Sequence, residues 1–399
     1  MDMQKTNIAR NIVVMHLKYS LCTLLLTMTV LGCINKIKDT DSSPQITEIN
    51  FGELKKVKNS ILNIDQIIRL KLSDSTVLGT INQVEVFNDK IYLLDDNYLY
   101  EFSFDGKFLR KLNRKGNGPG EFIMLHSFFI DHENGNLYLY DPIGGRLLSY
   151  GIQQFNFIQN IELPYLSPFS FIKDSKSDLF IYYYSIRPYD DLHTHLVMSN
   201  KEGIVKSHLL NGEKSGHLMH GDPRNIYSIN GIVRLYPNFS NKIYELNNDS
   251  LFTRYSLDFG PHSFPSAEFF MSFDDERPLM KELIVGDSNW IRLMYVYETQ
   301  KYLTVKYYIN REFYVAYWDK ESNKKLHFKA SDLDDDLRIG GNFPLPIGTY
   351  NDKIIGLLNP YTMDINQIEK PDLLYLKKSD LESQNPILLL YKIELMTNN

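Results

Sequence analysis

Cysteines and long apolar runs are scarce in this sequence of 399 residues, and it has no excess of basic over acidic side chains. The two cysteines, Cys22 and Cys33, lie in the first tenth of the chain, so a disulfide framework in its body is excluded. The formal net charge is -6, which leaves no basic excess to neutralise phosphates, and we expect no nucleic-acid partner. An apolar run of 13 residues, from Ser20 to Gly32, is too short to cross the roughly 30 Å core of a bilayer as a helix.

Linear catalytic motifs are also missing. The sequence has no Gly-x-Ser-x-Gly elbow, no His-Glu-x-x-His zinc motif and no cysteine nucleophile in its body. The acidic run that contains Asp332 and 334–336 lacks the glycine and the final glutamate of an EF-hand loop, which favours a solvated loop. We therefore predict no metal site and no cofactor. The histidines that have superficial metal-ligand spacing are His193, His195, His208, His217 and His220.

The N-terminus has the layout of a secretory signal. The basic side chains His16 and Lys18 precede the apolar run, and the small residue Gly32 stands directly before Cys33. The ending Val-Leu-Gly-Cys resembles a bacterial lipobox, whose cysteine is acylated and becomes the mature N-terminus. A buried apolar helix that ends in Gly-Cys is the alternative. We predict a signal peptide over residues 1–32 and a lipid on Cys33 that anchors the protein to a membrane, at the periplasmic or outer face of a bacterial cell envelope, with the outer membrane favoured.

Residues 33–59 are polar and contain few large apolar side chains, which predicts a flexible tether.

Beyond residue 59 the chain repeats one pattern of short apolar strands separated by turns. The pair Asp105 and Gly106, between two alternating apolar segments, is a strong hairpin signal. The repeated units are Asp89–Asn113, Asn134–Leu163, Ser177–Leu210, Asn230–Phe259, Lys301–Ala330 and a last unit that opens at Asn351.

Six units over residues 60–399 correspond to one four-stranded sheet each, with generous loops. Hairpins at this spacing exclude a βαβ sheet, and a repeated period favours a propeller over a sandwich, because each blade buries its faces against its neighbours. We therefore predict an all-β fold, a six-bladed β-propeller. The segment from Pro265 to Ile284 breaks the pattern and predicts a short helical insertion, capped by Ser266, with Phe269, Phe270 and Phe273 facing inward.

A glycine-rich loop, Arg-Lys-Gly-Asn-Gly-Pro-Gly-Glu-Phe, separates the first unit from the second. A phosphate-binding loop would end in Gly-Lys-Ser/Thr and lead into a helix, whereas here Glu121 and a strand follow. We interpret the loop as a sharp turn in which glycines allow positive φ and the carboxylate of Glu121 accepts backbone N–H groups. The residues of this loop are Gly116, Gly118, Pro119, Gly120, Glu121 and Phe122.

This loop, following Phe-Asp-Gly-Lys-Phe-Leu-Arg-Lys-Leu, resembles the signature of the six-bladed β-propeller lipoproteins of Gram-negative bacteria, which are related to NHL-repeat and TolB-like propellers. The resemblance covers nearly the whole chain. It implies a fold and a cellular location, but no particular enzymatic activity. Some six-bladed relatives are lactonases whose metal ligands lie singly around the channel mouth. The resemblance therefore leaves open an alternative, a propeller hydrolase or lyase that holds a divalent metal in its central channel.

Aromatic side chains are dense in the segment Phe-Ile-Tyr-Tyr-Tyr-Ser-Ile-Arg-Pro-Tyr-Asp-Asp. Planar and charged groups in a loop suit the recognition of sugars or peptides, while tyrosines in a strand also pack between blades. We expect a binding or scaffold module for a protein, peptide or glycan partner. The candidate ligand-binding residues are Tyr184, Arg187, Tyr189 and Asp190.

Overall fold

The computed structural model describes residues 46–72, 78–96, 98–184, 194–211, 224–273, 275–285, 289–334, 343–360, 376 and 385–394. The chain divides into two compact units, residues 1–45 and 46–399, and all of the described residues belong to the second. None of the helices in these described ranges is long and apolar enough to span a membrane. The candidate lipidation site Cys33 lies outside them.

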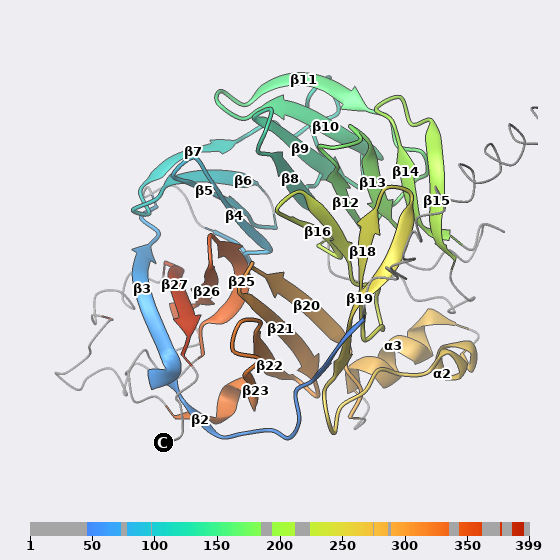
Figure 1. Ribbon diagram of the computed structural model, residues 1–399. Coiled ribbons are helices and arrows are strands. Elements are labelled where there is room, and N and C mark those ends of the chain that lie inside the picture. Colours follow the sequence, from blue (N-terminus) through green and yellow to red (C-terminus); the bar gives the residue numbers. More distant parts are fainter. Residues whose placement is uncertain are drawn as a thin grey trace, which may run out of the picture. The chain divides into compact units, whose positions relative to one another are not determined.

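Six antiparallel sheets form a ring around a central channel (Figure 1), which confirms the predicted all-β propeller. Each sheet is called a blade here, numbered in chain order from the first complete sheet. Blade 1 contains β4 (Gln83–Phe87), β5 (Lys90–Leu94), β6 (Leu99–Ser103) and β7 (Phe108–Leu112). Blade 2 contains β8 (Ser127–Asp131), β9 (Asn136–Asp141), β10 (Arg146–Gly151) and β11 (Asn156–Ile161). Blade 3 contains β12 (Ser170–Lys173), β13 (Phe180–Tyr183), β14 (Thr194–Ser199) and β15 (Val205–Asn211).

The second half of the ring follows the same order, with the innermost strand first. Blade 4 contains β16 (Ile226–Ile229), β17 (Ile232–Leu235), β18 (Lys242–Asn247) and β19 (Ser250–Asp258). Blade 5 contains β20 (Leu293–Glu298), β21 (Tyr302–Ile309), β22 (Glu312–Asp319) and β23 (Lys325–Lys329). Blade 6 contains β25 (Leu345–Tyr350), β26 (Lys353–Leu358), β27 (Ile387–Ile393) and β3 (Leu62–Arg69), so its outer strand comes from the start of the described chain.

The apolar core lies between neighbouring blades because the side chains of each strand alternate between the two faces of its sheet. Tyr182 packs in the cluster between blades 2 and 3, whereas Tyr183, next in sequence, packs in the cluster between blades 3 and 4. Both side chains are almost fully buried. Each blade therefore shelters an apolar face of its neighbour.

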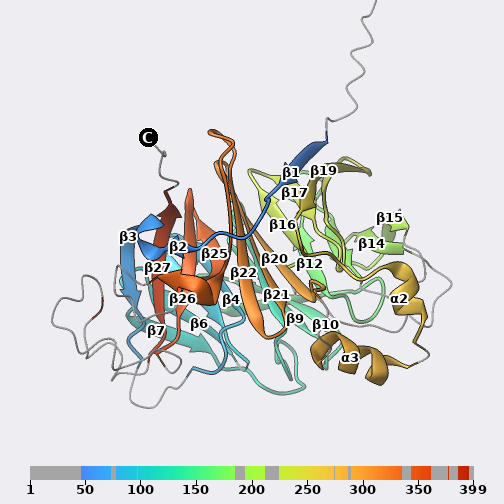
Figure 2. The same cartoon turned by 90° about the horizontal axis from the view of Figure 1, so that it is seen from below.

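The structure differs from the expected tether over residues 47–58. The strand β1 (Thr47–Asn50) pairs in parallel with β19 and extends blade 4 to five strands, and β2 (Val57–Lys58) pairs with β24 (Leu333–Asp334). The segment runs from blade 4 past the outer strand of blade 5 to β3 (Figures 1 and 2). Buried Ile49 and Phe51 explain the difference, since two apolar side chains among polar ones suffice to dock the segment.

The predicted helical insertion lies between blades 4 and 5 and comprises α2 (Ala267–Met271) and α3 (Glu276–Val285). The side chain of Ser266 accepts a hydrogen bond from the N–H of Phe269, as expected for a helix cap. Phe270 is buried together with Leu279 and Leu283 in a small core of the insertion. Two short 3-10 helices, Asn59–Ile61 and Ala330–Asp332, complete the described elements.

Candidate functional site: the central channel

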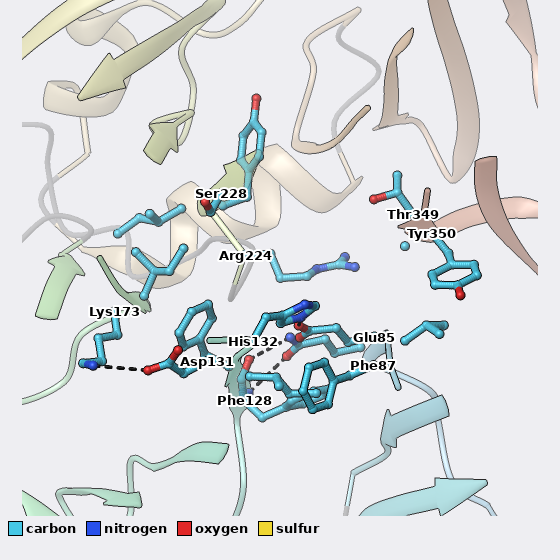
Figure 3. Close-up of a pocket in the computed structure, with 18 of the residues that line it drawn as sticks. Glu85, Phe87, Phe128, Asp131, His132, Lys173, Arg224, Ser228, Thr349 and Tyr350 are labelled. Atoms are coloured by element: carbon cyan, nitrogen blue, oxygen red, sulfur yellow. Dashed lines mark hydrogen bonds and ion pairs between the residues drawn. The ribbon is translucent and has the colours of Figure 1, made fainter. Parts of the chain in front are cut away.

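A cavity of about 740 Å³ occupies the channel and is lined by residues from the innermost strands of all six blades (Figure 3). These strands are β4, β8, β12, β16, β20 and β25. Buried polar groups in the lining need hydrogen-bond partners, and those partners fix the positions of the side chains. The contacts of each lining side chain therefore show which groups face the cavity and could meet a ligand.

Glu85 on β4 and His132 after β8 form a pair across the boundary between blades 1 and 2. The Oε1 atom of Glu85 lies 2.8 Å from Nε2 of His132, and the imidazole ring packs against the ring of Phe87 at 4.8 Å between centroids. Burial raises the pKa of the Glu85 carboxyl above its usual range, although the hydrogen bond to His132 opposes part of this effect. The same hydrogen bond raises the pKa of His132. With 54% of its side chain exposed, His132 presents this pair to the cavity.

A second pair, Asp131 on β8 and Lys173 on β12, links blades 2 and 3. Their Oδ2 and Nζ atoms lie 3.2 Å apart, and the ammonium of Lys173 also contacts Asp178 at 2.7 Å. Burial works to raise the pKa of Asp131, but hydrogen bonds from Asn134 and Lys173 outweigh it and lower the pKa. The aspartate is therefore ionised and fixed in place.

Arg224, just before β16 of blade 4, reaches into the channel and contacts the next two blades, 5 and 6. Its Nη1 donates to the carbonyl oxygen of Ile347 on β25 at 2.8 Å, and its Nη2 donates to the hydroxyl of Tyr297 on β20 at 3.1 Å. The guanidinium lies 5.2 Å from the centroid of the Tyr297 ring. One cation thus ties three blades together inside the cavity (Figure 3).

Glu298, at the end of β20, belongs to the lining of the cavity, and its fully buried side chain lies in a network of charges. Its carboxylate accepts hydrogen bonds from the hydroxyl of Tyr227 at 2.6 Å and the ammonium of Lys320 at 2.5 Å, and it contacts the guanidinium of Arg234. Burial alone would raise the pKa of Glu298, but Lys320 and Arg234 outweigh it and hold the pKa below its usual range. The network joins blades 4 and 5.

Uncharged groups also line the channel mouth, together with the carboxylates of Glu133 and Asp174. Ser228, Asn230 and Asn351 are exposed at the ends of inner strands, and the rings of Phe87 and Tyr350 are half-buried beside them. The cavity therefore offers amide and hydroxyl groups next to aromatic surface, a combination that suits a polar organic ligand.

The sequence-predicted binding residues lie elsewhere. Tyr184 directly follows β13, is buried, and donates its hydroxyl hydrogen to the carbonyl of Tyr165 at 3.1 Å, so it packs between blades instead of facing a ligand. The sequence analysis gave this packing between blades as the alternative to ligand binding. Arg187, Tyr189 and Asp190 lie outside the described residues.

The histidines noted in the sequence form no cluster where they are described. His195 donates from Nδ1 to the carbonyl of Tyr184 at 2.9 Å, while His208 lies 3.2 Å from the hydroxyl of Tyr165. Across the described ranges, no three His, Cys, Asp or Glu side chains gather in an arrangement that could hold a metal ion. His193, His217, His220, Asp335 and Asp336 fall outside those ranges.

The glycine-rich loop forms a tight turn between β7 and β8. The N–H of Gly118 donates to Oε2 of Glu121 at 2.8 Å, and the N–H of Glu121 donates back to the carbonyl of Gly118 at 3.1 Å. Phe122 is fully buried between blades 1 and 2, and the hydroxyl of Tyr150 donates to the carbonyl of Gly120. The loop thus directs the chain from the outer strand of one blade to the inner strand of the next. Gly116 and Pro119 lie in the same turn.

The sequence analysis did not predict that the channel residues line a cavity. Glu85 and His132 are 47 positions apart, and nothing local relates them. The alternation of Gln83, Glu85 and Phe87 with two valines was the available signal, since it marks a strand with one polar face.

Six blades around a lined channel define a β-propeller with an axial cavity. Residues 36–357 match the family described as six-bladed β-propeller, DUF5128, and the chain belongs to this family. No curated protein sequence matches the chain.

Solved structures share the fold. One is a Bacteroides fragilis protein described as exported, with 24% identity and a TM-score of 0.75, covering 88% of this chain and 100% of that one. A DUF4221 family member from Bacteroides vulgatus has 13% identity and a TM-score of 0.50, covering 83% and 97%. A TolB protein from Agrobacterium tumefaciens has 12% identity and covers 64% and 85%, but its TM-score of 0.39 is too low to support an argument. These likenesses establish the fold.

Proposed function

We propose that the mature chain is a binding module at the bacterial cell envelope, held to the membrane by a lipid on Cys33, and that its protein, peptide or glycan partner enters the central channel. The observation that carries the binding role is the cavity of about 740 Å³, which is lined by all six blades and contains the pair of partly buried Glu85 and exposed His132. A cavity of this size, with a few fixed polar groups among aromatic rings, is typical of ligand sites.

The address rests on two observations. The order of basic residues, apolar run, Gly32 and Cys33 matches lipoprotein processing. The structure most similar in fold among those compared above comes from a protein described as exported. Both agree with a position outside the cytoplasm, and we favour the outer membrane.

The alternative of a metal-dependent hydrolase or lyase has less support. Three of the five carboxylates that line the channel, Glu85, Asp131 and Glu298, each contact a basic side chain. A divalent ion would have to displace these cations before it gained the carboxylates as ligands.

Lipidation is tested by substituting each cysteine in the full chain. We expect Cys33→Ser to abolish incorporation of a labelled fatty acid and to release the protein from the membrane fraction. The matched variant Cys22→Ser lies within the predicted signal and should keep both properties. Label retained by Cys33→Ser would overturn the proposed anchor.

Binding in the channel is tested with a variant that fills the mouth. Ser228→Trp places a large ring on an exposed position of the lining, and Ser250→Trp places the same ring on an exposed turn at the outer edge of blade 4. We expect the first variant alone to lose binding in thermal-shift screens of oligosaccharide and peptide sets. A ligand that binds both variants equally would place the binding site outside the channel.

A further inference from the structure

Charges of both signs line the channel in nearly equal number. Glu85 contacts His132, Asp131 contacts Lys173, and Glu298 contacts Lys320 and Arg234. Glu133, Asp174 and Arg224 complete the charged lining. Because opposite charges that lie close together largely cancel each other's field a few ångströms away, the cavity has no strong net potential of either sign. An anionic ligand such as a phosphate or a uronic acid chain, or a strongly cationic peptide, would gain little from it.

The groups left to meet a ligand are mostly uncharged. Ser228, Asn230 and Asn351 expose hydroxyl and amide groups at the mouth, and Phe87 and Tyr350 expose part of their ring surface. Figure 3 shows Phe87 beside Glu85 and His132, and Tyr350 to their right, on the neighbouring blade 6. A sugar ring has an apolar face of C–H groups and a rim of hydroxyls, so it matches aromatic surface bordered by donors and acceptors.

The pair of Glu85 and His132 adds a fixed acceptor to this surface. The hydrogen bond of 2.8 Å sets the orientation of both side chains before a ligand arrives. A carboxylate held in this way accepts stronger hydrogen bonds from hydroxyl groups than a neutral oxygen does. Preorganisation also lowers the entropy cost of binding.

We propose that the channel mouth binds a neutral oligosaccharide, with Glu85 accepting hydrogen bonds from sugar hydroxyls and the aromatic rings contacting the sugar face. This inference rests on the proposed function in one respect, namely that the channel is the binding site. It goes further in naming a neutral carbohydrate rather than a peptide or a charged glycan.

The test uses the protein without residues 1–32 and three sets of probes: neutral oligosaccharides of two to six sugars, oligosaccharides of uronic acids, and short cationic and neutral peptides. Isothermal titration calorimetry at low and high salt is run on the unmodified body and on Glu85→Gln. We expect a neutral oligosaccharide to bind with an affinity that does not change with salt, because no net charge is neutralised. We expect Glu85→Gln to weaken it roughly tenfold, since a charge-assisted hydrogen bond becomes a neutral one.

The control variant Glu202→Gln removes an exposed carboxylate at an outer turn of blade 3 and should leave the affinity unchanged. If a charged glycan or a peptide binds instead, with an affinity that Ser228→Trp abolishes, the carbohydrate inference is overturned while the channel remains the binding site. If folded protein binds none of the probe sets, or binds them equally with Ser228→Trp, the carbohydrate inference and the binding role of the channel are both overturned.

Discussion

Leu62, the first residue of β3, lies opposite Ile393, the last residue of β27, so the two ends of the described chain meet in one sheet. The side chains of Asn63 and Glu394, 331 positions apart, are hydrogen bonded beside this pair. The ring of blades is therefore closed by noncovalent pairing between strands from opposite ends of the chain.

Removing β3 should open the ring. We expect a variant that lacks residues 46–69 to lose cooperative thermal unfolding, because β27 loses its neighbouring strand and the core loses the buried side chains of Leu62 and Ile68. A variant that lacks only residues 46–58 should still unfold cooperatively at a lower temperature. Circular dichroism on heating distinguishes the two. Equal melting temperatures would show that β3 does not close the ring.

Glu298 should be the most sensitive charged residue among those in the described channel network. Glu298→Gln removes the carboxylate that Lys320 contacts and leaves Arg234 only the partly exposed Glu245 as a countercharge, and we expect a loss of about 3–5 kcal/mol in the free energy of unfolding. Glu245→Gln is the matched control, since Glu245 also contacts Arg234 but is 28% exposed, and should cost less than about 1 kcal/mol. Urea unfolding gives both values. A similar small loss in both variants would contradict the role assigned to burial.

Gly120 should tolerate a side chain less well than Gly135, although both have positive φ, +68° and +63°. A Cβ atom at position 120 would lie 2.5 Å from Cγ of Phe157, whereas at position 135 its nearest neighbour would be 3.8 Å away. Alanine at either site costs about 1 kcal/mol or more in backbone strain, and we expect Gly120→Ala to cost a further 1–3 kcal/mol or so through the clash. Denaturant midpoints compare the two variants. Equal midpoints would show that Phe157 moves aside freely.

Acid should destabilise the protein through His262. This buried imidazole donates from Nδ1 to the hydroxyl of Tyr307 at 2.7 Å, and that hydroxyl donates to His327, whose own Nδ1 donates to the carbonyl of Gly52 at 2.9 Å. Burial, with a smaller effect of His327, lowers the pKa of His262 to about 4. The unfolded chain, with an ordinary histidine pKa near 6.5, then binds more protons than the folded chain below that pH.

The stability contributed by neutral His262 is present above pH 6.5 and falls as the pH drops toward 4. We expect a loss on the order of 1–2 kcal/mol between pH 7 and pH 5, and His262→Gln should reduce this pH dependence. His132→Gln is a control of opposite sign, because the raised pKa of His132 makes its contribution largest in acid. The measurement is the free energy of unfolding of the unmodified protein and of both variants at the two pH values. An unchanged pH dependence in His262→Gln would contradict the assignment.

Local pattern predicted the outer three strands of blades 1 to 5 because their signals are contained within a few residues, whereas in blade 6 it located only the segment that opens at Asn351 and contains β26. The turn at Asp105 and Gly106 is an example, since Gly106 adopts φ of +89° between β6 and β7 as a hairpin turn requires. The cap at Ser266 was likewise readable from one residue and the helix that follows it.

Features that depend on distant partners were not readable in this way. The strand β1 has the sequence Thr-Glu-Ile-Asn, which is too polar to predict a strand. Its pairing with β19 brings Asn50 into hydrogen-bond contact with Asp258, 208 positions away. The channel site was missed for the same reason, because Glu85 contacts His132 only after neighbouring blades pack together. Tyr184 was assigned to a ligand surface because a tyrosine-rich strand end looks alike whether its rings face solvent or a neighbouring sheet.

The composition of blade 6 has a consequence for synthesis of the chain. Its outer strand ends at Arg69, yet the neighbouring strand begins only at Ile387. At about 5–20 residues per second, a ribosome takes tens of seconds to make the intervening segment, and β3 has no hydrogen-bonding neighbour during that time. The ring of a nascent chain therefore stays unclosed until β27 has been synthesised.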